Sequence, residues 1–353
     1  MKNLKLSTLF TAVALLFILA SCHKDKNVTP VVTPVTDGFY TLNQGLQNDD
    51  NSSLSFYSYT TKQPISDIFL SANGRGVGDT GNDIEIYGSK MYIVVNVSST
   101  IEVVDPNTAK SIKQIKMFTG TVAREPRDIA FYKGNAYVTS YDGTVAVIDT
   151  ATLAITQNIT VGSYPEQLTV ANGKIYVANS GGLNYPNYDN TVSVIDPTTA
   201  TVTKTLTVVI NPQDITADAN GNVYVLSEGN YGTIPSSLAI IDDNTDVVKS
   251  QANFDAGVFT VVGSNAYFIT NEGGVGVYNT TTQAITKSNF ISDGTAITTP
   301  FTITADATSG EVFVSDAKNY TSNGSVYVFD KTGKLEYSTT VGVNPGKIAL
   351  LKK

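Results

Sequence analysis

Residues 126–149 read PRDIAFYKGNAYVTSYDGTVAVID, and the same order of segments recurs along the chain. Two further clear copies begin at Pro165 and Pro212, and each has a run containing Tyr-Val followed by a run ending in Ile-Asp. About seven copies can be aligned, with a repeat length of roughly 40–47 residues. A repeat of this length that holds four short strands is typical of a β-propeller blade.

The strands are predicted from short runs of Val, Ile, Tyr and Thr that are bounded by Gly, Asn, Asp or Pro. The pairs Asn172-Gly173 and Asn220-Gly221 are tight hairpin signals between first and second strands. Third strands such as residues 145–148 are apolar at every position, which indicates blades packed face to face. No helical period continues after Ala20.

The repeats predict an all-β fold, a seven-bladed β-propeller of four-stranded antiparallel blades. The inner strands of blades two to seven are expected to start near Asp83, Asp128, Gln167, Asp214, Thr260 and Thr302. Blade one begins at Gly38 with what resembles a second strand, and its missing first strand resembles residues 344–350. The C-terminal strand is therefore expected to complete blade one and close the ring, which removes the exposed sheet edges.

The N-terminal segment divides the chain into three parts. Residues 1–21 have Lys2 and Lys5 before an apolar run too short to span a bilayer, as in a signal peptide. The run ends in Leu-Ala-Ser-Cys22, which resembles a lipoprotein cleavage site and predicts acylation of Cys22; an ordinary secretory signal is the alternative. Residues 22–37 are expected to form a flexible tether, and residues 38–353 the propeller. A lipid-anchored outer-membrane location follows, with surface exposure favoured and the periplasmic leaflet left open.

Several chemistries are excluded by composition. The single histidine, His23, lies in the tether and the single cysteine is Cys22, so the ring has no His-based triad or metal cluster and no thiol chemistry. The net charge is −8, and it becomes −10 when the two lysines of residues 1–21 are removed, so nucleic acid is not an expected partner. We expect no enzyme activity and no cofactor, although a carboxylate pair across the channel stays an open alternative.

Acidic residues have a structural interpretation in this repeat. The aligned Asp83, Asp128 and Asp214 suggest a metal ring, but hydrogen bonding at the start of each inner strand is the favoured interpretation. The adjacent pair Asp242-Asp243 is expected to form a turn rather than a catalytic site.

The loops between second and third strands vary in length, and they all lie on one face of a propeller. They are tight in blades two, three and six but long in blades four, five, seven and one, and insertions on one face usually mark a binding face. Tyrosines occur in three of these insertions, and asparagines accompany them, a composition suited to binding. The predicted ligand-binding residues are Arg75, Arg127, Glu166, Tyr185, Tyr188, Gln213, Tyr231 and Tyr320.

The blades resemble those of the YVTN family of seven-bladed propellers. The segments that carry the resemblance are VGSYP at 161–165, IYVAN at 175–179 and TVSVID at 191–196. Blade six departs from it, with Gly257 where proline is usual. Together with the lipoprotein signal, the chain resembles surface propeller lipoproteins of diderm gut bacteria. That resemblance implies capture of a corrinoid such as cobalamin and its hand-over to a TonB-dependent outer-membrane transporter.

Two classes of function therefore stand. The first is a surface lipoprotein that captures a small-molecule ligand, with a corrinoid as the leading candidate. The second is a scaffold that binds protein or glycan and has no small-molecule site. A lyase or hydrolase is a more distant third.

Overall fold

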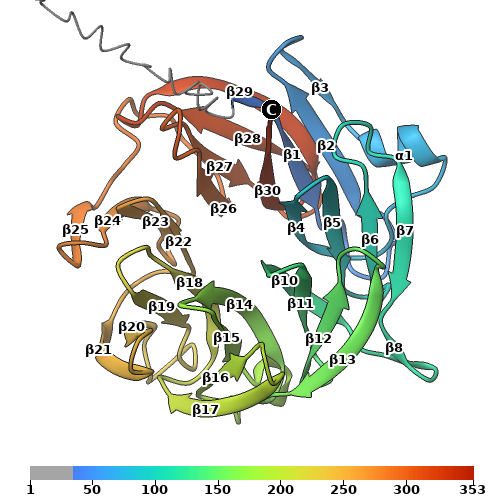
Figure 1. Cartoon of the computed structure of the whole chain (residues 1–353). Helices are drawn as coiled ribbons and strands as arrows, with labels where there is room; N and C mark the ends of the chain where they lie inside the picture. The colour runs from blue at the N-terminus through green and yellow to red at the C-terminus, as the bar shows by residue number, and fades with distance from the viewer. Residues whose placement is uncertain (1–34) are drawn as a thin grey trace, which may run out of the picture. The chain divides into compact units, whose positions relative to one another are not determined.

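The computed structural model describes residues 35–353, and these residues form seven four-stranded antiparallel sheets arranged around a central axis (Figure 1). The expected fold class is confirmed. The predicted signal peptide, Cys22 and most of the tether lie outside the described residues. In the part that is described, no helix is long and apolar enough to cross a membrane.

The first four blades follow chain order apart from the last strand of the chain. Blade one comprises β1 (Thr36–Asn43), β2 (Ser53–Ser58), β3 (Gln63–Ile65) and β30 (Pro345–Lys352); blade two comprises β4 (Gly81–Tyr87), β5 (Lys90–Val95), β6 (Thr100–Val104) and β7 (Ser111–Lys116); blade three comprises β10 (Pro126–Tyr132), β11 (Asn135–Ser140), β12 (Thr144–Asp149) and β13 (Ala154–Thr160); blade four comprises β14 (Pro165–Ala171), β15 (Lys174–Asn179), β16 (Thr191–Asp196) and β17 (Thr201–Thr207).

The remaining blades repeat the same order. Blade five comprises β18 (Pro212–Ala217), β19 (Asn222–Ser227), β20 (Ser237–Asp242) and β21 (Val247–Asn253); blade six comprises β22 (Val258–Val262), β23 (Asn265–Ile269), β24 (Val275–Asn279) and β25 (Ala284–Lys287); blade seven comprises β26 (Pro300–Ala305), β27 (Val312–Asp316), β28 (Asn323–Phe329) and β29 (Leu335–Val343). A small hairpin of β8 (Phe118–Thr119) and β9 (Val122–Ala123) and a 3-10 turn, η1 (Gly182–Asn184), complete the elements.

The ring is closed as the sequence predicts. Strand β30 pairs antiparallel with β1, with Ala349 opposite Tyr40 and Ile348 opposite Thr41. The backbone of Val35 also exchanges two hydrogen bonds of 2.9 Å with that of Lys353. The inner strand of blade one therefore comes from the far end of the chain, and the four strands of this blade hold both ends of the ring together.

Both faces of each blade are buried, which explains the unbroken apolar runs. In blade three, Ala146 and Ile148 pack into a cluster shared with blade two. Val145 and Val147, which alternate with them, pack into a separate cluster shared with blade four. Alternate side chains of one strand thus belong to two inter-blade cores.

One short helix was not expected from the sequence. Helix α1 (Ile68–Asn73) lies between blades one and two and buries Phe69. Asp67 caps its start by accepting a hydrogen bond from the Leu70 amide, and Gly74 ends it in the left-handed conformation. Six residues are too few to show a helical period in the sequence, so the cap and the glycine were the available signals.

Candidate functional site

A cavity of about 730 Å³ runs along the central axis and is lined by the inner strand of every blade. Because the blades are repeats, equivalent positions form layers around it. The layer at the mouth contains Asn82, Arg127, Glu166, Gln213 and Phe301; the middle layer contains Asp128, Gln167, Asp214, Val258, Thr302 and Lys347; the deeper layer contains Glu85, Ala130, Thr169, Thr216, Thr260, Thr304 and Ala349.

The middle layer joins neighbouring blades. Each aspartate reaches the next blade: Asp83 accepts a hydrogen bond of 3.1 Å from the Ile129 amide. Asp128 does the same with the amide of Leu168 at 2.9 Å, and Asp214 with that of Phe259 at 2.8 Å. The structural interpretation of these aligned aspartates is therefore confirmed. Within residues 35–353, no group of three or more His, Cys, Asp or Glu side chains is arranged to hold a metal ion.

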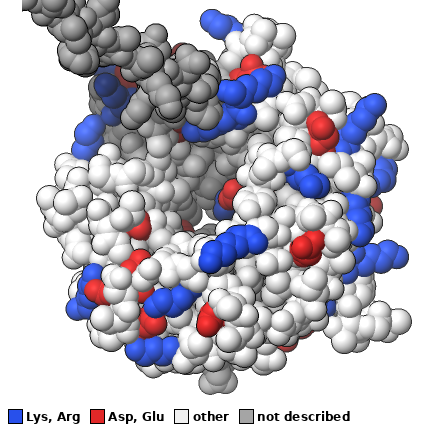
Figure 2. Space-filling view, in the orientation of Figure 1, with Lys and Arg blue, Asp and Glu red and all other residues white. Residues whose placement is uncertain are grey.

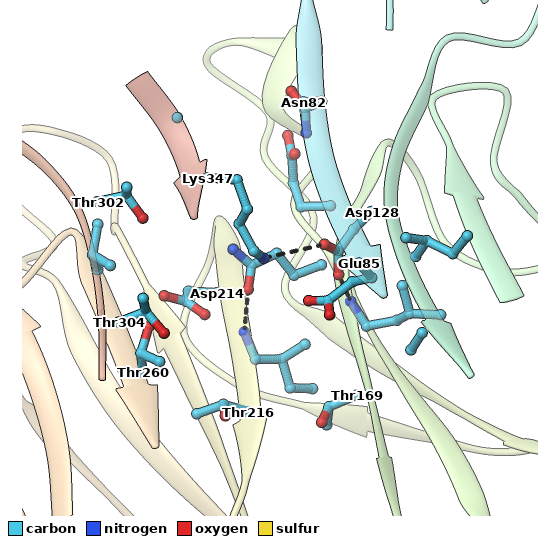
Figure 3. A pocket seen from close by; sticks show the side chains of 18 of the residues that line it. Asn82, Glu85, Asp128, Thr169, Asp214, Thr216, Thr260, Thr302, Thr304 and Lys347 are labelled. Atoms are coloured by element: carbon cyan, nitrogen blue, oxygen red, sulfur yellow. Dashed lines mark hydrogen bonds and ion pairs between the residues drawn. The ribbon is translucent and has the colours of Figure 1, made fainter. Parts of the chain in front are cut away.

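Lys347 supplies positive charge within this layer. Its amine lies 3.0 Å from Asp83 and 3.8 Å from Asp128, and it points toward Asp128 in Figure 3. Burial, the largest single influence, raises the pKa of Asp83, but the charge of Lys347 together with hydrogen bonds from Asp128, Lys347 and the Ile129 amide lowers it overall. Burial and the neighbouring charge of Asp83 instead hold the pKa of Asp128 well above its ordinary value. The pKa values of the two neighbouring carboxyls are therefore shifted in opposite directions, with ionisation favoured at Asp83.

The deeper layer is polar, and its polar side chains are distributed unevenly around the axis. Burial, with the charge of Asp83 adding to it, raises the pKa of Glu85 to about 7. In the middle layer, burial likewise raises the pKa of Asp214 to about 6. Figure 3 shows Glu85 and Asp128 on one side of the cavity and threonines of the later blades on the other, namely Thr260, Thr302 and Thr304. Carboxyl and hydroxyl oxygens thus dominate the polar lining, which suits a ligand rich in hydrogen-bond donors.

An ion pair bridges two blades at the mouth. The Arg127 guanidinium donates to Glu166 at 2.8 Å and to the Asn82 side chain at 2.6 Å. The guanidinium carbon also lies 4.7 Å from the centroid of the Tyr141 ring, and the Tyr141 hydroxyl donates to Glu166 at 2.6 Å. Arg127 and Glu166 do line the cavity as predicted, but their charges are largely satisfied by each other.

Three of the predicted tyrosines form one cluster beside the mouth. The ring centroids of Tyr185 and Tyr188 are 6.0 Å apart, and those of Tyr188 and Tyr231 are 6.2 Å apart, both with edge-to-face geometry. Tyr185 is 73% exposed and Tyr231 is 67% exposed. The Tyr231 hydroxyl donates to Glu228 and accepts from Asn211 at 3.2 Å, and it lies 3.5 Å from the Gln213 amide nitrogen. Because Gln213 lines the cavity, the cluster adjoins its mouth.

The other two predicted residues lie apart from this cluster. Tyr320 of blade seven is half-exposed and packs edge-to-face on Phe301, which lines the mouth. Arg75 is not beside the central cavity. It pairs with Glu102 at 2.9 Å and covers the Phe69 ring, and it lines a second cavity on blade two. A loop between blades can lie over the channel or over the rim, and the buried Glu102 holds this one at the rim.

Three asparagines in or beside the long loops have side chains that are occupied by hydrogen bonds within the protein. Asn179 is fully buried and bonds to Thr191 and Ser193 within its blade. Asn230 accepts from two amides of its own loop, and so does Asn319. Their side chains are therefore already occupied, as expected for residues that shape turns.

Sequence reasoning missed Lys347 and Glu85. The signal for Lys347 was present, since Pro345-Gly346-Lys347-Ile348 aligns with Pro126-Arg127-Asp128-Ile129 and places a lysine at the position of the aspartates. Glu85 follows Asp83 by two residues, so strand alternation sends both toward the axis.

The fold and this cavity define a seven-bladed propeller with a polar central site and an aromatic wall at its mouth. The chain belongs to the family described as a domain of unknown function, DUF5074, whose model matches residues 37–335. No curated protein sequence matches the chain.

Solved structures share the fold at low identity. A quinonprotein alcohol dehydrogenase-like protein from Bacteroides thetaiotaomicron is 18% identical with a TM-score of 0.64, covering 90% of this chain and 79% of its own. The computationally designed Ika8 protein is 14% identical with a TM-score of 0.57, covering 89% and 96%. Hydrazine synthase of Kuenenia stuttgartiensis is 16% identical with a TM-score of 0.53, covering 69% and 74%. At these identities the likeness extends to the fold alone.

Proposed function

We propose that this protein captures a small-molecule ligand at the mouth of its central cavity. The observation that carries the proposal is the edge-to-face cluster of Tyr185, Tyr188 and Tyr231 next to Gln213, in which Tyr185 and Tyr231 are exposed. Aromatic side chains beside a cavity offer a large apolar contact area to a ligand, and ligand pockets are commonly lined by them. Binding, rather than chemistry, is the role assigned to the site.

A corrinoid such as cobalamin is the ligand that we propose first. It is broad and flat, with apolar ring faces and a rim rich in amides. The tyrosine cluster offers aromatic area for a ring face. The carboxyl and threonine oxygens of the cavity offer acceptors for amide N–H groups. The ring residues include no His or Cys to coordinate cobalt, so binding should tolerate different upper axial groups.

The proposal also includes a cellular location and a receiver for the ligand. Acylation at Cys22 would anchor the chain in the outer membrane, and the tether would carry the ring away from the lipid. The captured ligand would then pass to a TonB-dependent outer-membrane transporter, because the site has groups for holding a ligand and no assigned groups for changing it.

Calorimetry with cyanocobalamin and with its precursor that lacks the lower ligand tests this function. We expect micromolar or tighter binding of both, and at least tenfold weaker binding after Tyr185, Tyr188 and Tyr231 are changed together to alanine. A variant with Val247→Ala and Ile285→Ala is the control, because it removes exposed apolar side chains from outer strands. Absence of binding to both ligands removes the corrinoid; undiminished binding by the triple variant places the site elsewhere.

A second candidate is docking of a protein or glycan on the same patch. Leu183 and Ile234 are also exposed on the loops that carry the tyrosines, and they extend the apolar area. A thermal-shift screen separates the two candidates. Stabilisation by oligosaccharides but not by corrinoids would favour the second.

A further inference from the structure

A second cavity, of about 520 Å³, lies on blade two and has no part in the proposed function. The loop after α1 forms one side, through Arg75 to Gly78. The turn before β6, the end of β7 and the β8–β9 hairpin form the rest, and the lining residues there are Ser98, Thr100, Gln114, Lys116, Phe118 and Gly120.

The Glu102 carboxylate beside this cavity is already neutralised. Glu102 is fully buried and accepts from Arg75 at 2.9 Å and from Gln114 at 3.0 Å, and Ser111 donates to it as well. Its charge is therefore compensated by the arginine and by two neutral donors. Lys116, in contrast, is exposed and makes no ion pair with any carboxylate of residues 35–353.

A hydroxyl in the lining has no partner. Thr100 is 7% exposed, and its Oγ1 makes no hydrogen bond within the described part of the chain. Burying a hydroxyl without a partner is unfavourable. Thr100 pairs directly with Lys116 across β6 and β7, so the hydroxyl and the ammonium lie on the same face of the sheet. The Oγ1 atom itself is closed to solvent, so Lys116 is the polar group of this strand pair that a ligand can reach.

The surroundings favour a negative ligand with an apolar part. Lys110, Lys113 and Lys116 lie on or next to β7, and Lys and Arg side chains gather along the edge of the ring over this strand in Figure 2. In a chain with net charge −8, this edge is a local region of positive potential that draws anions. Phe118 lines the same cavity and is 39% exposed, which supplies an apolar wall.

We propose that the blade-two cavity binds a small organic anion, with its charged group against Lys116 and its apolar part against Phe118. This site is independent of the central one. A ligand here can be tested while the tyrosine cluster is intact or removed.

Titrations of the full-length protein followed by calorimetry or NMR test the proposal with three probes. Phenyl phosphate carries both the anion and the apolar group, inorganic phosphate only the anion, and benzyl alcohol only the apolar group. We expect phenyl phosphate to bind most tightly and benzyl alcohol most weakly, with affinity for phenyl phosphate falling as salt is added. Equal binding of benzyl alcohol and phenyl phosphate, or no binding of either phosphate at millimolar concentration, overturns the proposal.

Three variants locate the site. Lys116→Gln should weaken phenyl phosphate binding roughly tenfold. Lys113→Gln is the matched control, because it removes the same charge from the same strand outside the cavity and should leave binding within roughly twofold. Thr100→Val is a second control: it should leave binding within roughly twofold and the melting temperature unchanged or raised, because its hydroxyl is unpartnered and closed to solvent. Equal losses in the two lysine variants contradict the assignment.

Discussion

The Lys347 amine lies 3.0 Å from the Asp83 carboxylate, and this contact joins the last strand of the ring to blade two, across the boundary of the blade that the strand completes. Burial alone would lower the pKa of Lys347, but the charges of Asp83, Asp128 and Glu85 raise it. The lysine is therefore held in its charged form, and it compensates the buried negative charge of Asp83 beside the middle layer of the cavity.

Replacing Lys347 by methionine should destabilise the ring. The change leaves the buried Asp83 without its cation, and breaking a buried pair in this way costs about 3–5 kcal/mol. The loss should shrink in acid. The depressed pKa of Asp83 contributes stability above the ordinary carboxyl range, and this contribution disappears as pH falls through the lowered pKa. Thermal melts at pH 8 and pH 2 measure the effect, with Lys347→Arg as the charge-preserving control; equal losses at both pH values would contradict it.

Glu85 should have the opposite pH dependence. Its folded-state pKa of about 7 lies above the ordinary 4.5, so the folded protein holds a proton that the unfolded chain releases between these values. Stability contributed by this group is full below pH 4.5 and is lost as pH rises through 7. Glu85→Gln should therefore match the wild type near pH 4 and exceed it by on the order of 2 kcal/mol at pH 8. Parallel pH profiles of the two proteins would disprove this account.

Removing residues 344–353 should destabilise the whole ring. The deletion takes the inner strand from blade one and leaves β1 unpaired on one side. We expect a melting temperature lower by roughly 10 °C or more, or failure to fold. Deleting Lys353 alone is the control. An unchanged melting temperature in the longer deletion would mean that closure contributes little.

Changing Cys22 to alanine should release the protein from membranes. The prediction follows from the Leu-Ala-Ser-Cys segment, in which the cysteine would carry the acyl chains. Fractionation of cells and labelling with a radioactive fatty acid would measure it. His23→Ala should stay in the membrane fraction and keep the label. Retention of the Cys22 variant in that fraction would point to another anchor.

The repeat predicted the fold because each blade uses the same few residues for the same task. The hydrogen bonds of Asp83 and Asp128 to the next blade show this directly, as does the pairing of β30 with β1. The binding-face residues were harder to predict. Arg127 and Gln213 lie where strand position placed them, because the inner strands fix their direction. Arg75 does not, because its loop follows a helix and is held by a charge on another strand.

Strand β30 also determines when, during synthesis, the ring can close and the central cavity can form. Ribosomes make β1, β2 and β3 first, and the strand that pairs with β1 begins at Pro345, 302 residues after β1 ends at Asn43 (345 − 43). Lys347 is on that partner, so the central cavity acquires its cation in the same event that closes the ring. A polypeptide released early would therefore lack a finished first blade and a finished cavity together, and ligand capture would report on completed synthesis.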